Sequence, residues 1–182
     1  MFWFVVCTGA AARCPITPYG WVNSDIQAGA GVDVVADIRG GLPLVDDSFD
    51  YIVSIHTLPE IPYGDLDRAL CELRRVLRPG GVLRLSLPDL DKAIRAYLAK
   101  DVDYFLIPDE VVQSIAGKMI VQLLWYGRSR SMFTIEFMVE LLARCGFHSI
   151  QPCPFRETAN VYPGIVELDD RELESFFIEA QK

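Results

Sequence analysis

Residues 70–87 read LCELRRVLRPGGVLRLSL, and this stretch carries the clearest signal of the fold. Up to Leu77, leucines recur at the spacing of one face of an amphipathic helix, with arginines on the other face. Gly80 and Gly81 then lead into an apolar run at residues 82–87. Glycine permits the left-handed backbone angles with which a helix can stop and reverse within about four residues. The stretch therefore predicts a helix, a tight turn and a buried strand in immediate succession.

On both sides of this stretch, short apolar runs alternate with helical patterns, which indicates an α/β fold with a parallel sheet covered on both faces. The predicted strands cover residues 2–7, 21–24, 32–36, 51–55, 82–87, 148–152 and 174–180. The predicted helices cover residues 63–77, 109–124 and 134–145, and a further helix begins at Asp89 with an inner face made of Leu90, Ile94, Tyr97 and Leu98.

Length and composition indicate one folded domain with its own core. The chain has 182 residues, of which 51% are hydrophobic, and its net charge is −8. This negative charge argues against nucleic acid or an anionic membrane as a partner. Five cysteines without a CxxC pair are typical of a reduced, cytoplasmic protein, and two histidines far apart argue against a metal site. The apolar N-terminus is too short for a membrane span and is interpreted as a buried first strand rather than a signal peptide.

Residues 46–54, DDSFDYIVS, open the predicted strand that precedes the 70–87 stretch. In this order the two segments resemble the second half of the class I, Rossmann-like S-adenosylmethionine (SAM)-dependent methyltransferases. Residues 20–25, GWVNSD, and the tail from Arg171 resemble a compact, type-11-like subgroup of that family. The resemblance implies a single Rossmann-like domain with a mostly parallel, seven-stranded sheet, an antiparallel last strand and helices on both faces. Its expected parts are a cofactor-binding half at 1–100, a helical insert or lid over the acceptor site at 101–133, and a C-terminal helix with the last strands at 134–182.

The resemblance also implies SAM as the cofactor, with S-adenosyl-L-homocysteine (SAH) as its product. The glycine loop that would lie under SAM follows the first strand, and it is degenerate because Cys7 replaces the family's first glycine. Thr8 and Gly9 are the cofactor-binding residues implied there. Small residues let the backbone approach a ligand closely. The same residues are also what an ordinary turn after a strand would contain.

Two acidic strand ends carry the rest of the implied cofactor site. Asp25, with Ile26 next to it, would accept hydrogen bonds from both ribose hydroxyls, because a carboxylate has only acceptors. Asp37 and Ile38 would bind the adenine ring. In open α/β sheets ligands bind at the carboxyl ends of the strands, which is where these residues fall. The alternative for each aspartate is a turn or a solvated strand end.

The loop after the fourth strand would border the methionine end of SAM through Ser54 and His56. The ordinary pKa of histidine suits a general base, so His56 is a catalytic candidate. The alternative is a histidine that packs under the cofactor and orders the loop. Glu60 stands where the family has a second histidine. Asp89 is a second candidate base, with a helix cap as its alternative.

Two classes of function follow from these residues. The first is a SAM-dependent methyltransferase acting on a small-molecule acceptor, with O-methylation of a saccharide or related metabolite as the expectation. The second is a catalytically degenerate protein of the same fold that binds a partner or completes its site as a homodimer. A nicotinamide dehydrogenase is disfavoured, because the chain lacks a full G-x-G-x-x-G motif.

Overall fold

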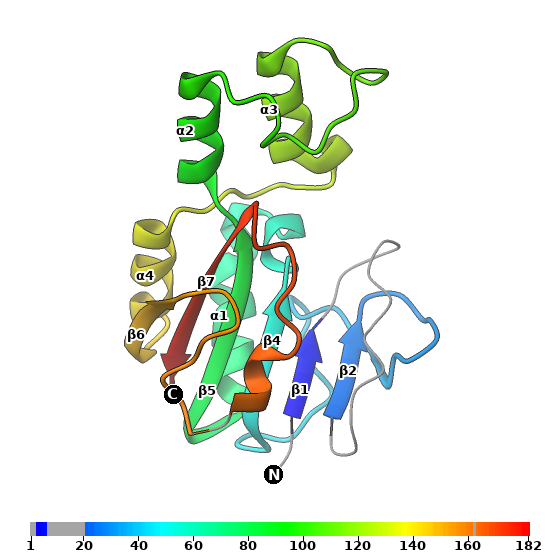
Figure 1. The fold of residues 1–182 in the computed structure, drawn as a ribbon. Coiled ribbons are helices and arrows are strands. Elements are labelled where there is room, and N and C mark those ends of the chain that lie inside the picture. The colour runs from blue at the N-terminus through cyan, green and yellow to red at the C-terminus, as the bar shows by residue number, and fades with distance from the viewer. Residues whose placement is uncertain (1–2, 7–20, 162) are drawn as a thin grey trace.

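A β-sheet runs through the computed structural model, which describes residues 3–6, 21–161 and 163–182 (Figure 1). Hydrogen bonds link its strands in the order β3-β2-β1-β4-β5-β7-β6. The strands are β1 (Trp3–Val6), β2 (Trp21–Asp25), β3 (Val34–Val35), β4 (Phe49–Ile55), β5 (Leu77–Pro88), β6 (His148–Cys153) and β7 (Ser175–Gln181). Pairs from β3 to β5 are parallel, whereas β7 is antiparallel to β5 and β6. The α/β class and the antiparallel last strand are therefore confirmed.

Helices surround this sheet unevenly. The α helices are α1 (Leu66–Val76), α2 (Leu90–Ala99), α3 (Ile115–Leu124) and α4 (Ile135–Arg144), and the short 3₁₀ helices are η1 (Leu58–Glu60), η2 (Tyr63–Asp65), η3 (Trp125–Gly127) and η4 (Pro163–Val166). Helices α1 and α4 pack together on one face and enclose the main core with β4 and β5 (Figure 1). None of the helices in the described ranges is long and apolar enough to cross a membrane.

The opposite face of the sheet is covered by a short 3₁₀ helix and the irregular chain beside it. Ile165, which is fully buried in η4, packs there against Tyr51, Val53 and Val82. In the described residues α helices cover one face, and the 3₁₀ helix η4 with its flanking chain covers the other (Figure 1). An irregular segment can do this because it fills the apolar surface and its backbone polar groups find partners on buried side chains.

The predicted glycine turn in residues 70–87 is confirmed, but the helix and the strand on its two sides have other boundaries than predicted. Helix α1 ends at Val76, and β5 begins at Leu77, five residues before the predicted start of the strand. Gly80 has a φ of 77°, the left-handed region that favours glycine. At Gly81 a Cβ atom would lie 2.9 Å from the carbonyl oxygen of Arg78, so backbone packing excludes a side chain there.

Helices α2 and α3 stand beyond the carboxyl ends of the strands and form a cap, residues 90–127 (Figure 1). The predicted inner face of α2 is wrong: Leu98 is 73% exposed, and Ile94 and Tyr97 are exposed as well. The buried residues are instead Ala93 and Ala96. The reason is that α2 packs against α3 and not against the sheet, and alanines allow two helices to approach closely.

Candidate active site

Two cavities lie at the carboxyl edge of the sheet, where the sequence places its acidic strand ends. The strand-end cavity, of about 680 Å³ with its open mouth, is bordered by β2, the segment after β3 and the loop after β4. The cap cavity, of about 810 Å³ with its mouth, lies between the sheet and the cap. Among the described residues, Glu60 is the one residue that lines both cavities.

The strand-end cavity brings together four of the residues that the sequence implied for a cofactor, Asp25, Ile26, Asp37 and Ile38. Asp25 is buried at the end of β2, and its Oδ1 accepts a hydrogen bond from the backbone N–H of Gln27 at 2.8 Å. A buried carboxylate is costly unless it is well hydrogen-bonded. The position therefore suits an acid that meets donors on a ligand.

Three further predicted residues are not among the described residues that line the two cavities. Thr8 and Gly9 are outside the described residues. Ser54 is fully buried in β4 and lines neither cavity, so a direct ligand contact from its side chain is not supported.

The carboxylate of Asp37 is held by a residue that sequence reasoning missed. Arg39 donates to both oxygens of Asp37, through Nε at 3.0 and 3.1 Å and through Nη2 at 2.6 Å. The hydrogen bonds from Arg39 hold the pKa of Asp37 below its usual range. In the sequence, the only sign of this pair is that Arg39 follows Asp37 by two positions. Acidic and basic residues often have this spacing without forming a pair. Any ligand that uses the Asp37 carboxylate must share it with Arg39.

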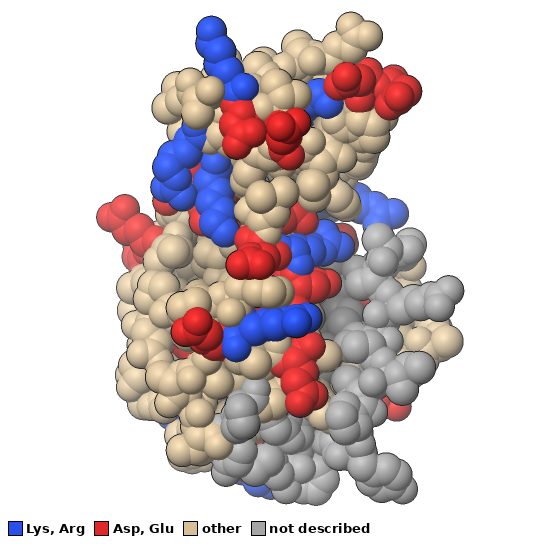
Figure 2. Space-filling view, viewed as in Figure 1, with Lys and Arg blue, Asp and Glu red and all other residues tan. Residues whose placement is uncertain are grey.

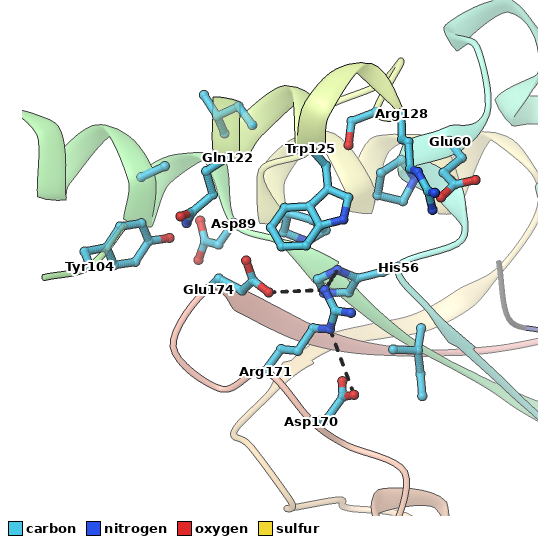
Figure 3. A pocket seen from close by; sticks show the side chains of 16 residues that line it. His56, Glu60, Asp89, Tyr104, Gln122, Trp125, Arg128, Asp170, Arg171 and Glu174 are labelled. Atoms are coloured by element: carbon cyan, nitrogen blue, oxygen red, sulfur yellow. Dashed lines mark hydrogen bonds and ion pairs between the residues drawn. The ribbon is translucent and has the colours of Figure 1, made fainter. Parts of the chain in front are cut away.

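The cap cavity collects polar side chains from four parts of the chain (Figure 3). They come from the loop after β4, the end of β5, the cap, and the segment that leads into β7. The polar and aromatic residues that line it are His56, Glu60, Asp89, Tyr104, Gln122, Trp125, Arg128, Ser129, Asp170, Arg171 and Glu174. The cavity is thus acidic and partly aromatic.

His56 is enclosed by the segment that leads into β7. Its Nδ1 lies 3.5 Å from Nη1 of Arg171, and its Nε2 lies 2.8 Å from Oγ of Ser175. Because a guanidinium can only donate, Nδ1 accepts and Nε2 carries the hydrogen toward Ser175. Burial, and then the charge of Arg171, lower the pKa of His56 to about 3. This geometry favours the alternative in which His56 orders the loop, because a neutral ring engaged at both nitrogens is a poor proton acceptor.

Asp89 has the capping role that was its alternative interpretation. Its Oδ1 accepts from the backbone N–H of Lys92 at 3.0 Å and starts helix α2. The carboxylate is also buried and lines the cap cavity. Because the helix cap uses only Oδ1, the carboxylate still stands on the cavity wall, and a capping role is compatible with a role in catalysis.

The segment before β7 supplies functional residues that the sequence analysis did not assign. Glu174 and Asp170 line the cap cavity, and burial raises the pKa of each carboxyl group. Arg171 lies between them, 3.4 Å from the carboxylate of Glu174 and 4.0 Å from that of Asp170 (Figure 3). Its guanidinium also stands 5.7 Å from the ring centre of Trp125. The tail motif that begins at Arg171 was visible in the sequence, but its contact with the cavity was not.

Charges on the outside of the molecule are mixed in sign. On the face shown in Figure 2, basic and acidic side chains alternate around the junction between the cap and the sheet, and the described surface there has no broad basic patch. In the described ranges, no group of His, Cys, Asp and Glu residues is arranged to hold a metal ion.

Comparison with known proteins adds the following similarities. A family model described as a methyltransferase domain matches residues 22–85. A probable methyltransferase, ltbC, from Aspergillus luteorubrus is 46% identical over 48 residues, which is 26% of this chain and 17% of that protein. The chain therefore matches less than a fifth of the length of this curated relative.

Solved structures of similar fold cover more of the chain. A SAM-dependent methyltransferase from Archaeoglobus fulgidus matches 89% of this chain and 76% of its own, with a TM-score of 0.55 and 14% identity. One from Mesorhizobium loti matches 89% and 80%, with a TM-score of 0.51 and 20% identity. The CMeT domain of the citrinin polyketide synthase matches 99% and 46%, with a TM-score of 0.56 and 14% identity.

Proposed function

We propose that this chain is a class I Rossmann-like methyltransferase that transfers the methyl group of SAM to a small-molecule acceptor. Its fold is similar to solved SAM-dependent methyltransferases, and a methyltransferase-domain model matches residues 22–85. The observation that carries the proposal is the pair of cavities that share Glu60. One is lined by the acidic strand ends that the family uses for its cofactor. The other is lined by buried carboxyl groups and aromatic rings, which can hold an acceptor.

The strand-end cavity fits SAM by the chemistry of its walls. The buried carboxylate of Asp25 suits the paired hydroxyls of a ribose, because each oxygen can accept a hydrogen bond. Ile26, Ile38 and Leu42 offer apolar walls for a flat ring. The roles of Asp37, Thr8 and Gly9 in cofactor binding remain part of this proposal.

When bound, SAM supplies a methyl group attached to a positively charged sulfur, and the carbon of that methyl group is the electrophile of the reaction. The protein positions the acceptor in the cap cavity and excludes water, because α2 and α3 close over that side of the site. A hydroxyl acceptor must lose its proton, and Asp89 and Glu174 are the buried carboxyl groups on that wall. Because burial raises the pKa of Glu174, a proton on its carboxylate is more favourable than on an exposed one.

For the acceptor we favour a saccharide or a related metabolite that is methylated on oxygen. Carboxylates accept hydrogen bonds from sugar hydroxyls, and the rings of Trp125 and Tyr104 give flat apolar surfaces against which a sugar face can pack. Both kinds of group line the cap cavity.

A second candidate is a protein of this fold that acts as the subunit of a complex, including a homodimer, without turnover of its own. The engagement of Asp37 by Arg39 favours it, because this pair occupies a carboxylate that the cofactor would otherwise use. A methyltransferase of similar fold from Haloferax volcanii, described as putative, was solved in complex with the Trm112 methyltransferase activator. It matches 88% of this chain and 71% of its own, with a TM-score of 0.53 and 12% identity.

Calorimetric titration of the purified protein with SAH, with NAD as the control ligand, tests the proposal. Binding of SAH in the micromolar range without binding of NAD supports a working cofactor site. If the protein binds neither ligand, the proposal that it is an enzyme is contradicted. A partner protein would then be sought by cross-linking and by mass measurement of the complex.

A further inference from the structure

Glu60 is the one described residue that lines both cavities. Figure 3 shows its side chain on the wall of the cap cavity. It is the last residue of η1 and is partly exposed. The other acidic residues of the site each line one cavity: Asp25 and Asp37 the strand-end cavity, and Asp89, Asp170 and Glu174 the cap cavity. Glu60 therefore stands where the two cavities adjoin.

The backbone around Glu60 is fixed from two directions. Within η1 its own N–H donates to the carbonyl of Thr57 at 3.1 Å. From the chain that follows the cap, the N–H groups of Arg130 and Ser131 donate to the carbonyl of Pro59 at 2.7 and 3.1 Å. Leu58 and Pro59 are buried beneath it. The backbone that carries the Glu60 side chain is thus held at a defined place beside both cavities, which favours recognition of a charge there.

The carboxylate of Glu60 forms no ion pair with the described part of the chain. None of the ion pairs found there includes it, and no hydrogen bond to its side chain is present. Arg128 and Arg130 each line one of the cavities but do not pair with it. A carboxylate that faces two cavities and has no ion-pair partner among the described residues attracts a positive charge brought there by a ligand.

We propose that Glu60 recognises the positive charge of the sulfonium group, so that this protein distinguishes SAM from SAH. The inference rests on the proposed function and adds a specificity-determining residue to it. Methyl transfer turns a charged sulfonium into a neutral thioether, and Glu60 attracts the first and not the second. The product therefore loses one attraction at the moment it forms, which favours its release.

The test is calorimetric titration of wild-type protein and of Glu60→Gln with SAM, with SAH, and with sinefungin, whose amine carries a positive charge near the position of the sulfonium. We expect the ratio of the SAH to the SAM dissociation constant to fall roughly fivefold to tenfold in Glu60→Gln. In Glu60→Gln the binding of sinefungin should weaken by the same factor as that of SAM, and the binding of SAH should stay unchanged. Glu60→Asp, which keeps the charge, should retain most of the ratio. Glu136→Gln, an exposed control that lines neither cavity, should leave all three constants as they are.

Each other outcome has a definite meaning. An unchanged ratio in Glu60→Gln overturns the inference, and so does an equal loss of SAM and SAH, which would make Glu60 a structural residue. A wild-type protein that binds neither SAM nor SAH overturns the proposed function itself. The two failures are distinguishable because SAH binding to the wild-type protein reports the cofactor site without involving the sulfonium charge.

Discussion

Arg84 on β5 and Asp169, 85 residues later, form two parallel hydrogen bonds in the interior, Nε to Oδ1 at 2.8 Å and Nη2 to Oδ2 at 2.5 Å. Both side chains are fully buried. Nη1 of Arg84 also pairs with Glu179 at 2.6 Å and donates to the carbonyl of Glu157. One buried cation thus ties the irregular chain between β6 and β7 onto the sheet face that lacks a described α helix.

Replacement of Arg84 by methionine should lower the free energy of unfolding by about 3–5 kcal/mol, because it leaves two buried carboxylates without their partner. Chemical denaturation of wild type and variant measures this loss. Arg78→Met is the matched control, since Arg78 pairs with Asp50 at the surface and such pairs contribute about 1 kcal/mol or less. A similar loss in both variants would contradict a special role for the buried cluster.

The stability of the protein should fall as the pH decreases below 6.5, in part because of His56. The folded pKa is lowered to about 3 from 6.5, first by burial and then by Arg171. Between these two values the unfolded chain binds a proton that the folded protein does not. The contribution is therefore complete above pH 6.5 and decreases by up to about 1.4 kcal/mol per pH unit toward pH 3.

Urea unfolding of wild type and His56→Gln at about pH 5 and about pH 7.5 checks this expectation. The difference in unfolding free energy between the two pH values should be smaller in His56→Gln. The exposed His148, replaced by Gln, should retain the wild-type difference. Identical pH dependence in all three proteins would show that His56 titrates normally.

Asp25→Ala should weaken SAH binding at least tenfold, because the ligand loses charge-assisted hydrogen bonds worth about 1.5–3 kcal/mol. Calorimetry with SAH measures the change. Asp91→Ala provides the control, since Asp91 is exposed and lines neither cavity. Unchanged affinity in Asp25→Ala would remove Asp25 from the cofactor site.

Alanine substitutions at Gly80 and Gly81 should lower the stability of the protein, whereas the same substitution at the control position Gly64 should not. Gly80→Ala should cost about 1–2 kcal/mol, because φ is 77° and a Cβ atom is strained there. Gly81→Ala should cost at least as much, because its Cβ would meet backbone oxygens at 2.9 and 3.1 Å. Gly64→Ala should change little, because nothing lies within 4 Å of the added atom. Thermal unfolding gives the order, and a costly Gly64→Ala would contradict it.

Local patterns in the sequence identified much of the fold and some of the residues that line the two cavities. The leucine spacing of α1, the glycine at φ 77° and the capping role of Asp89 depend on neighbours in the chain, so the sequence shows them directly. Asp25 and Asp37 were found for a related reason. They end strands, and the ends of parallel strands meet at one edge of a sheet.

Tertiary structure alone decided which surfaces meet. Periodicity cannot say that α2 packs against α3 through Ala93 and Ala96, because exposed and buried apolar faces have the same spacing. Nor does any local signal join His56 to Arg171, which are 115 residues apart, or place Glu60 between two cavities. Side chains distant in the sequence converge only when the sheet order brings their elements together, and that order is a property of the whole packed core.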